Sequence, residues 1–178
     1  GMEESSMTIE VKVMVGIPGS GKSTWANKEA ELLEMDGFHI AIISRDVIRE
    51  SFIGDKDYFS RENEVFEEFV RQINECLEIG IDYIFVDATH ISQGSRAKLL
   101  GRLRPDGKTG LSFEVCDCGI DTCIARNNLR KGFSKVPDSA IRKMARGFRP
   151  PTPAEFELYK YGFKDVKINH HNMEEGDK

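Results

Sequence analysis

Residues 16–24 read G-I-P-G-S-G-K-S-T, a complete match to the pattern G-x-x-x-x-G-K-[ST]. Glycines at 16, 19 and 21 permit the tight turns that point successive N–H groups inward, where they can hold phosphate oxygens. The apolar run 11–15 before the loop is typical of a buried strand, and the residues from Ser23 onward have a helical pattern. This strand–loop–helix unit predicts an alternating α/β fold with an anion site where the first strand ends.

The loop supplies a set of candidate nucleotide-binding residues. Lys22 can place its ammonium on the β- and γ-phosphates of a nucleotide, and the Ser23 hydroxyl can ligate Mg²⁺. The full set is Gly16, Pro18, Gly19, Ser20, Gly21, Lys22, Ser23 and Thr24. We therefore expect the chain to bind a nucleoside triphosphate with Mg²⁺. ATP is assumed, because no base-recognition motif is visible.

Length and charge set broader limits. The 178 residues suffice for a single domain with a real core, and we expect 1–8 and 170–178 to be disordered polar tails. No apolar stretch approaches the length of a membrane span and no signal peptide is visible, so we expect a soluble cytoplasmic protein without a membrane partner. The net charge of −5 hides a basic segment from Arg96 to Arg149, which suggests one surface that handles anions.

The four cysteines give little evidence of a disulfide framework. Cys76, Cys116, Cys118 and Cys123 are too few and too irregularly spaced for a set of disulfides. No second Cys/His pair lies at zinc-finger spacing. We expect reduced, partly buried thiols rather than a metal site.

Hydrophobic patterning predicts one α/β unit with a central, mostly parallel sheet flanked by helices. The expected strands lie near 9–17, 39–43, 81–86, 111–116 and 163–168, and the expected helices near 23–35, 60–79, 95–103, 121–131 and from 137 onward. A polar stretch is expected after Asp46, through 54–58. Ser60 is the expected N-cap of the second helix, and Gly80 is its expected stop.

Two carboxylates follow predicted strands. Asp46 lies where ligands collect in open α/β sheets, so it can accept the proton of an attacking hydroxyl, while Arg49 can neutralise phosphate charge. The alternative is an N-cap aspartate beside a solvated arginine. Asp87 ends the most apolar strand. A carboxylate is expected at this place, where it supports either Mg²⁺, through water, or a neighbouring active-site arginine. Its alternative is a simple turn residue.

Basic residues suggest two further surfaces. Arg126 and Arg130 are spaced i, i+4, so they can share one helix face and act as a lid over the triphosphate, although surface arginines at this spacing are common. A second set could form a groove for a nucleic-acid strand or could equally be a solvated helix face. It comprises Arg96, Lys98, Arg102 and Arg104.

These pieces together resemble the 5′-polynucleotide kinase type of P-loop kinases over about 11–149. The pieces are G-I-P-G-S-G-K-S-T-W-A (16–26), S-R-D-V-I-R (44–49), V-D-A-T-H (86–90), Arg96, A-R-N-N-L-R-K-G (125–132) and K-V-P-D-S-A-I-R-K-M (135–144). The resemblance implies a P-loop NTPase/kinase fold in one domain over 1–178, with an Arg-bearing helical lid at about 121–149. It also implies an ATP- and Mg²⁺-dependent kinase.

The resemblance assigns roles to the candidate residues. It implies that Asp46 is the general base for a 5′-OH and that Arg49 contacts the acceptor phosphate or orients the base. It further implies that Lys22 and Ser23 serve the triphosphate and Mg²⁺. Catalytic Arg126 and Arg130 would then act from the lid, Arg126 also binding the nucleotide.

Two departures from the pattern of this kinase type put the identity of the phosphate acceptor in question. Val47 stands where the phage enzyme of this type has a second aspartate, and His90 stands where many relatives have asparagine. No phosphatase or ligase module accompanies the kinase motifs, so healing of a nucleic-acid end would need a separate phosphatase or ligase partner. The alternatives are a kinase of a small hydroxyl metabolite, nucleoside or tRNA-linked group, and a nucleotide-dependent switch.

Overall fold

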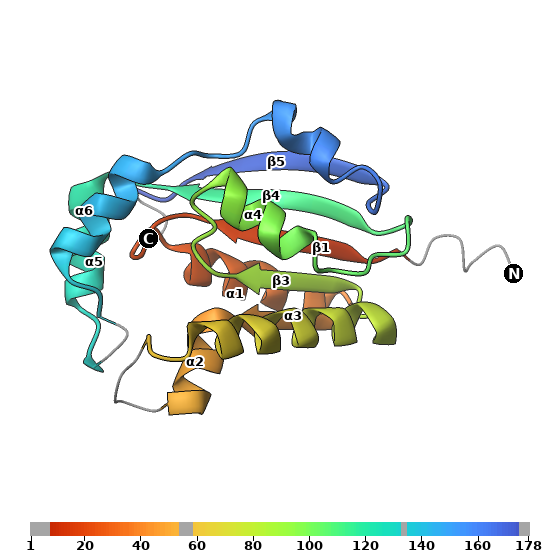
Figure 1. Ribbon diagram of the computed structural model, residues 1–178, viewed down its shortest axis with the longest axis horizontal. Coiled ribbons are helices and arrows are strands. Elements are labelled where there is room, and N and C mark those ends of the chain that lie inside the picture. The colour runs from red at the N-terminus through yellow and green to blue at the C-terminus, as the bar shows by residue number, and fades with distance from the viewer. Residues whose placement is uncertain (1–7, 54–58, 133–134, 175–178) are drawn as a thin grey trace, which may run out of the picture.

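A sheet of parallel strands runs through the middle of the molecule (Figure 1). The computed structural model describes residues 8–53, 59–132 and 135–174. In this part of the chain the sheet has five strands in the order β2-β3-β1-β4-β5, and every neighbouring pair is parallel. The strands are β1 (Glu10–Val15), β2 (Ile40–Ser44), β3 (Tyr83–Asp87), β4 (Gly110–Asp117) and β5 (Asp165–Asn172). The helices are α1 (Lys22–Met35), α2 (Arg45–Ile53), α3 (Glu62–Ile79), α4 (Gln93–Leu100), α5 (Ile120–Asn128), α6 (Asp138–Gly147) and a 3₁₀ helix (Pro153–Leu158).

Helices cover both faces of the sheet, as the predicted α/β class requires. Successive residues of β1 point to opposite faces: Val13 joins the core with α3 and α4, whereas Met14 joins the core with α1. The central strands β1 and β3 are therefore buried on two sides, which explains their nearly continuous apolar sequences.

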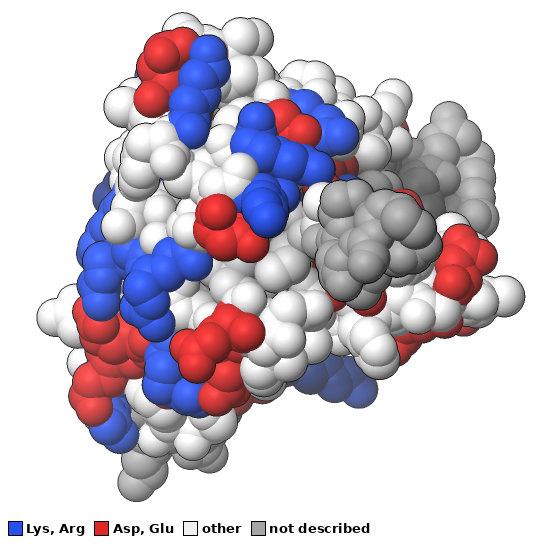
Figure 2. Space-filling model, turned by 90° about the vertical axis from the view of Figure 1, so that its right-hand side faces the viewer, with Lys and Arg blue, Asp and Glu red and all other residues white. Residues whose placement is uncertain are grey.

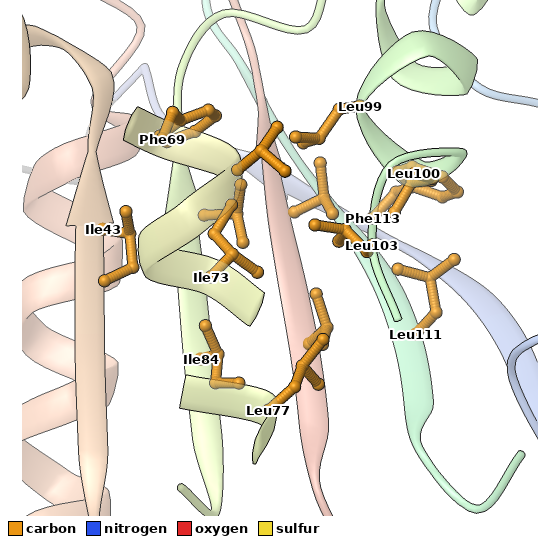
Figure 3. Packing of buried hydrophobic residues seen from close by; sticks show 14 of the residues in the cluster. Ile43, Phe69, Ile73, Leu77, Ile84, Leu99, Leu100, Leu103, Leu111 and Phe113 are labelled. Carbon is orange, nitrogen blue, oxygen red and sulfur yellow. The ribbon is translucent and has the colours of Figure 1, made fainter. Parts of the chain in front are cut away.

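The larger core lies between the sheet and α3 (Figure 3). Phe69, Ile73 and Leu77 recur at helical spacing on α3 and face Ile84 of β3 and neighbouring strand residues. The helix ends as predicted, because Gly80 has φ +93 and its N–H donates to the Cys76 oxygen. Its expected N-cap Ser60 is wrong: the cap residue is Arg61.

One helix was not predicted. Residues 45–53 form α2 directly after β2, where a polar stretch was expected. The helix forms because Ile48 and the half-buried Phe52, four residues apart, pack on the core that contains α3. The rest of the expected stretch, 54–58, lies outside the described residues.

The expected C-terminal tail is also wrong where the chain is described. β5 continues through residues 170–172, and Met173 is buried. The strand continues although it is polar, because its side chains bind the buried carboxylate of Glu114 on β4. Asn169 Nδ2 donates to this carboxylate at 3.0 Å, and His171 Nε2 lies 2.8 Å from it. The tail expected at 1–8 lies almost wholly outside the described residues.

Helices α5 and α6 lie side by side at the carboxyl ends of the strands (Figure 1). Cys123 and Ile124 of α5 pack with Ile141 of α6 and with Ile17 of the phosphate-binding loop. The region expected as a lid is thus in direct contact with the loop. Among the described helices, none has the length and apolar character needed to cross a membrane.

Candidate active site

The loop between β1 and α1 is closely packed. Gly19 and Gly21 have φ +83 and +97, a backbone region that favours glycine. A Cβ on Gly16 would lie 2.5 Å from Ser20 Oγ, and a Cβ on Gly19 would lie 2.2 Å from the backbone oxygen of Cys123. The glycines are therefore needed both for the turn and for the close approach of α5.

The start of α1 fits an anion. Its N-cap is Gly21, no side chain caps the first turn, and that turn holds no acidic residue. The first N–H groups of a helix have no partner within the helix, and together with the helix dipole they favour a phosphate. The hydroxyl of Ser20 is buried and has no hydrogen-bond partner among the described residues. This unpaired group and the uncapped helix start fit the phosphates of a nucleotide.

Lys22 lies buried at the base of the loop. Its Nζ donates to the Ile17 backbone oxygen at 3.3 Å. Burial lowers the pKa of Lys22, the nearby Asp87 carboxylate raises it, and Arg130 lowers it again. The ammonium thus lies near both negatively and positively charged groups, as expected for a cation that binds a phosphate.

Ser23 and Asp87 meet across the sheet edge. Ser23 Oγ donates to Asp87 Oδ2 at 2.8 Å, although the two residues are 64 positions apart. Asp87 is the last residue of β3, which pairs directly with β1, so the strand order brings the carboxylate to the start of α1. A hydroxyl and a carboxylate are oxygen ligands of the kind that Mg²⁺ prefers, so these two residues fit the metal.

Asp46 is an exposed carboxylate held in place by an arginine. Its side chain is 62% exposed, and Arg49 Nη1 donates to Asp46 Oδ1. Arg49 is buried and is itself fixed by two bonds to Glu62 of α3, from Nε at 2.5 Å and from Nη2 at 2.7 Å. An oriented, exposed carboxylate can accept a proton from a hydroxyl.

Both parts of the alternative interpretation of this pair are wrong. Asp46 lies inside α2 rather than at its N-cap, and the hydroxyl of Ser44 accepts the bond from the Val47 N–H instead. Arg49 is buried rather than solvated. Its neighbour Arg45 has a buried Nε without a hydrogen-bond partner in the described part of the chain.

Arg126 lies over the loop, but the expected shared helix face is wrong. Its Nη1 is 3.6 Å from the position of a Cβ on Gly21, and its Nη2 donates to the Met173 backbone oxygen at 2.6 Å. Arg130 does not lie on α5, because the helix ends at Asn128. The charge of Arg130 nevertheless lowers the pKa of Lys22 in the loop.

The end of the described chain contributes residues that sequence reasoning missed. Met173 Cε is 2.9 Å from the position of a Cβ on Gly21. Glu174 accepts hydrogen bonds from the N–H of Gly119, at 2.8 Å, and from the hydroxyl of Thr122. These contacts join β5 to α5 beside the loop. A polar run without hydrophobic periodicity carries no signal for them.

Arg96 belongs neither to a basic groove nor to a solvated helix face, the two alternatives left open for it. This residue is 1% exposed, and its Nε and Nη2 donate to Glu155 at 2.9 and 2.8 Å, while its Nη1 donates to the His90 oxygen at 2.8 Å. Arg102 donates to Glu67 of α3 at 2.9 and 2.6 Å. Lys98 lies 4.6 Å over the Phe66 ring. Arg104 is exposed.

His90 is likewise a structural residue. It is 6% exposed, and its Nδ1 lies 2.7 Å from the Met14 backbone oxygen. Burial lowers the pKa of His90 to about 4. Its ring lies in the core between β1 and α3, where it stacks on Phe69, so the His90 side chain does not face solvent.

The strand order, the loop, and the Ser23–Asp87 pair at the carboxyl edge of the sheet define a P-loop kinase fold. The chain belongs to the AAA domain family (AAA_33), whose profile matches residues 11–151. The predicted fold class is confirmed, and so is the resemblance to P-loop kinases of the polynucleotide kinase type.

Solved structures show the same fold. A chain from the structure of the Pnkp1/Rnl/Hen1 RNA repair complex matches with 24% identity and a TM-score of 0.63, over 79% of this chain and 44% of that one. Kti12 from Chaetomium thermophilum, in complex with ADP-AlF3, matches with 14% identity and a TM-score of 0.63, over 93% and 92%. Shikimate kinase from Acinetobacter baumannii, in complex with shikimate, matches with 15% identity and a TM-score of 0.51, over 97% and 90%. The chain thus spans less than half of the repair-complex chain.

Proposed function

We propose that the protein is an ATP-dependent kinase that transfers the γ-phosphate to the 5′-OH of a polynucleotide, with Asp46 as general base. The observation that carries this proposal is the position of Asp46 at the carboxyl edge of the sheet, exposed and oriented by Arg49. Asp46 also acts electrostatically on Lys22, so the candidate base and the candidate phosphate ligand are neighbours. A protein that only binds nucleotide has no need of such a base.

The chemistry follows from these positions. The acceptor hydroxyl gives its proton to an Asp46 carboxylate oxygen as its own oxygen attacks the γ-phosphorus, and the bond to the ADP oxygen breaks. Lys22, Arg126 and Arg130 spread the charge that develops on the transferring phosphoryl group. Ser23 and Asp87 would hold Mg²⁺, which neutralises phosphate charge when it is bound.

The acceptor end is proposed to be bound by Arg45. Its half-buried guanidinium pairs with Glu62 through Nη2 at 3.4 Å, while its Nε, one residue from Asp46, has no hydrogen-bond partner among the described residues. An anion is the natural partner for such a group. Arg49, already engaged by Asp46 and Glu62, is proposed to orient the base rather than to bind the acceptor phosphate.

A small hydroxyl compound is the second candidate acceptor. The ion pairs of Arg96 with Glu155 and of Arg102 with Glu67 favour this acceptor. Arginines that are paired within the protein offer less of a basic groove to a long strand. Similar structures include shikimate kinase and a sugar kinase from Janibacter sp. HTCC2649, the latter with 18% identity and a TM-score of 0.53 over 92% of this chain and 85% of that one. The donor side of the site would be the same for either acceptor.

A partner protein is proposed for the polynucleotide case. The similar chain in the Pnkp1/Rnl/Hen1 structure belongs to an RNA repair complex. A separate phosphatase or ligase would complete the repair that a kinase begins.

The test is transfer of labelled γ-phosphate from Mg²⁺-ATP to a panel of 5′-OH DNA, 5′-OH RNA, nucleosides and sugars. Label at the 5′ end of an oligonucleotide is the expected result. Label on a small compound alone would retain the kinase and overturn the polynucleotide acceptor. ATP binding without label on any member would contradict the proposed transfer and favour a nucleotide-dependent switch.

A further inference from the structure

Two thiols lie next to each other beneath the phosphate-binding loop. Cys118 Sγ and Cys123 Sγ are 2.9 Å apart, and both cysteines are free. Cys118 follows β4, Gly119 is the N-cap of α5, and Cys123 lies in the first turns of that helix. A bond between the two sulfurs would therefore fasten the start of α5 to the end of β4.

This pair touches both the loop and the lid arginine. Cys118 Sγ lies 3.9 Å from the Gly19 backbone oxygen and 3.7 Å from Arg126 Nη1. The backbone oxygen of Cys123 lies so close to Gly19 that a Cβ there would approach it to 2.2 Å. A change at the sulfurs is thus passed directly to the loop backbone and to Arg126.

The two thiols differ in access. Cys118 is half-buried and lines a cavity of about 190 Å³ together with Ser20 and Phe148. The guanidinium of Arg126 lies beside the Cys118 sulfur. Cys123 is fully buried in an apolar cluster, and burial raises the pKa of its thiol to about 12. Cys118 is the thiol that a reagent meets first.

We propose that Cys118 and Cys123 form a reversible disulfide that weakens nucleotide binding. The Cys118 thiolate attacks one sulfur of a small disulfide RSSR, and RS⁻ leaves and takes up a proton. The Cys123 sulfur then attacks Cys118 Sγ, loses its proton, and releases the second RSH. Two protein thiols are oxidised to one disulfide while RSSR is reduced to two RSH.

The bond weakens nucleotide binding because it moves the loop. Bond formation draws the two sulfurs together, and the first turns of α5 shift with Cys123. Since the Cys123 backbone oxygen lies close to Gly19, we expect a shift of Cys123 to displace the loop. Arg126, which lies on the same helix, shifts as well. The proposal concerns nucleotide binding alone and holds for any acceptor.

The experiment is ADP binding by calorimetry, before and after treatment with oxidised glutathione and again after dithiothreitol. The oxidised protein should bind ADP about fivefold or more weakly, and reduction should restore the affinity. Cleavage before Asp121, which lies between the two cysteines, should release two peptides joined by the disulfide.

Two variants make the test specific. Cys118→Ser should lose both the link and the response of ADP affinity to oxidation. Cys76→Ser, which removes a half-buried thiol on α3, should retain both. Recovery of glutathione on Cys118 without a link to Cys123 would overturn the pair. A complete link with unchanged ADP affinity would overturn its effect on the loop.

Discussion

At the scale of residues, the Ser23–Asp87 hydrogen bond joins the loop to the neighbouring strand. Ser23 is exposed and Asp87 is half-buried, so both oxygens can reach a metal ion without a change in the fold. Ser23 and Asp87 would hold Mg²⁺ through their oxygens, at the edge of the sheet where both already lie.

Asp87→Asn tests this arrangement. The amide keeps the shape of the side chain but loses its charge, so we expect Mg²⁺ to strengthen ADP binding at least tenfold less than in the wild type, a loss of about 1.4 kcal/mol. Calorimetry of ADP with and without Mg²⁺ measures this difference. Asp82→Asn is the matched control, because Asp82 lies just before β3, at the other end of that strand from Asp87. Equal Mg²⁺ dependence in both variants would contradict the metal site.

His90 makes stability depend on pH. Its pKa is about 4 in the folded protein and about 6.5 when unfolded, so the unfolded chain binds more protons between these values. Folding stability therefore rises with pH across this window, and a contribution on the order of 3 kcal/mol is lost as the pH falls from about 6.5 to about 4.

Urea unfolding of His90→Asn checks this sign. Asparagine tolerates the φ of +49 at this position, and we expect a smaller loss of stability between pH 7 and pH 5 than in the wild type. His39→Asn, at an exposed histidine, should keep the wild-type dependence. An unchanged pH dependence in His90→Asn would mean that this histidine does not titrate as inferred.

The residue scale also shows what a local pattern can predict. The loop glycines and Lys22 lie within nine positions, so their geometry follows from a short motif and short-range sterics. In the sequence, nothing distinguishes Arg96 from a surface arginine. In the fold it is buried and donates to Glu155, which lies 59 positions away in the chain. Only the tertiary fold makes this partner known.

At the scale of elements, Arg96 and Glu155 tie α4 to the 3₁₀ helix. Both side chains are almost fully buried, and Tyr159 donates a further bond to Glu155 at 2.8 Å. Removing one partner leaves an uncompensated buried charge, which costs about 3–5 kcal/mol. We expect Arg96→Ala to lose stability on this scale in urea unfolding.

The control for this prediction is Arg102→Ala. Arg102 pairs with Glu67 on the surface, where screening by solvent leaves an ion pair little net effect on stability. Similar small losses for both variants would show that Arg96 does not have the structural role inferred for it.

The elements that were predicted wrongly share a cause. Strands β1 and β3 were identified from nearly continuous apolar runs, and helix α3 was identified from an apolar stripe at helical spacing. Helix α2 is short and follows β2 without an intervening turn, and the end of β5 is polar because its partner is a buried carboxylate. In both cases tertiary contacts outweigh local propensity.

At the scale of the whole molecule, both ends of the sheet carry charged side chains. Figure 2 shows the end where the strands begin, and there Lys and Arg lie beside Asp and Glu. Lys164 pairs with Glu10 at the start of β1. At the opposite end, α6 carries exposed Arg142 and Arg146 beside helix α5. A polyanion is therefore expected to approach from the end with α6.

Salt dependence tests this expectation for a polynucleotide acceptor. The double variant Arg142→Ser/Arg146→Ser should raise KM for a 5′-OH oligonucleotide and reduce the slope of log KM against log salt by about 1 to 2. Lys160→Ser/Lys164→Ser, which removes the same charge near the start of β5, should change neither quantity. Equal effects of the two variants would mean that α6 does not receive the strand.

The central claim is that Asp46 is the base in phosphoryl transfer, and single-turnover transfer by Asp46→Asn tests it most directly. The variant should bind ATP with nearly unchanged affinity and transfer phosphate about 10²-fold more slowly. Glu50→Gln removes an exposed carboxylate from the same helix and should transfer at the wild-type rate. Wild-type transfer by Asp46→Asn, measured with the acceptor that the panel identifies, would contradict the claim.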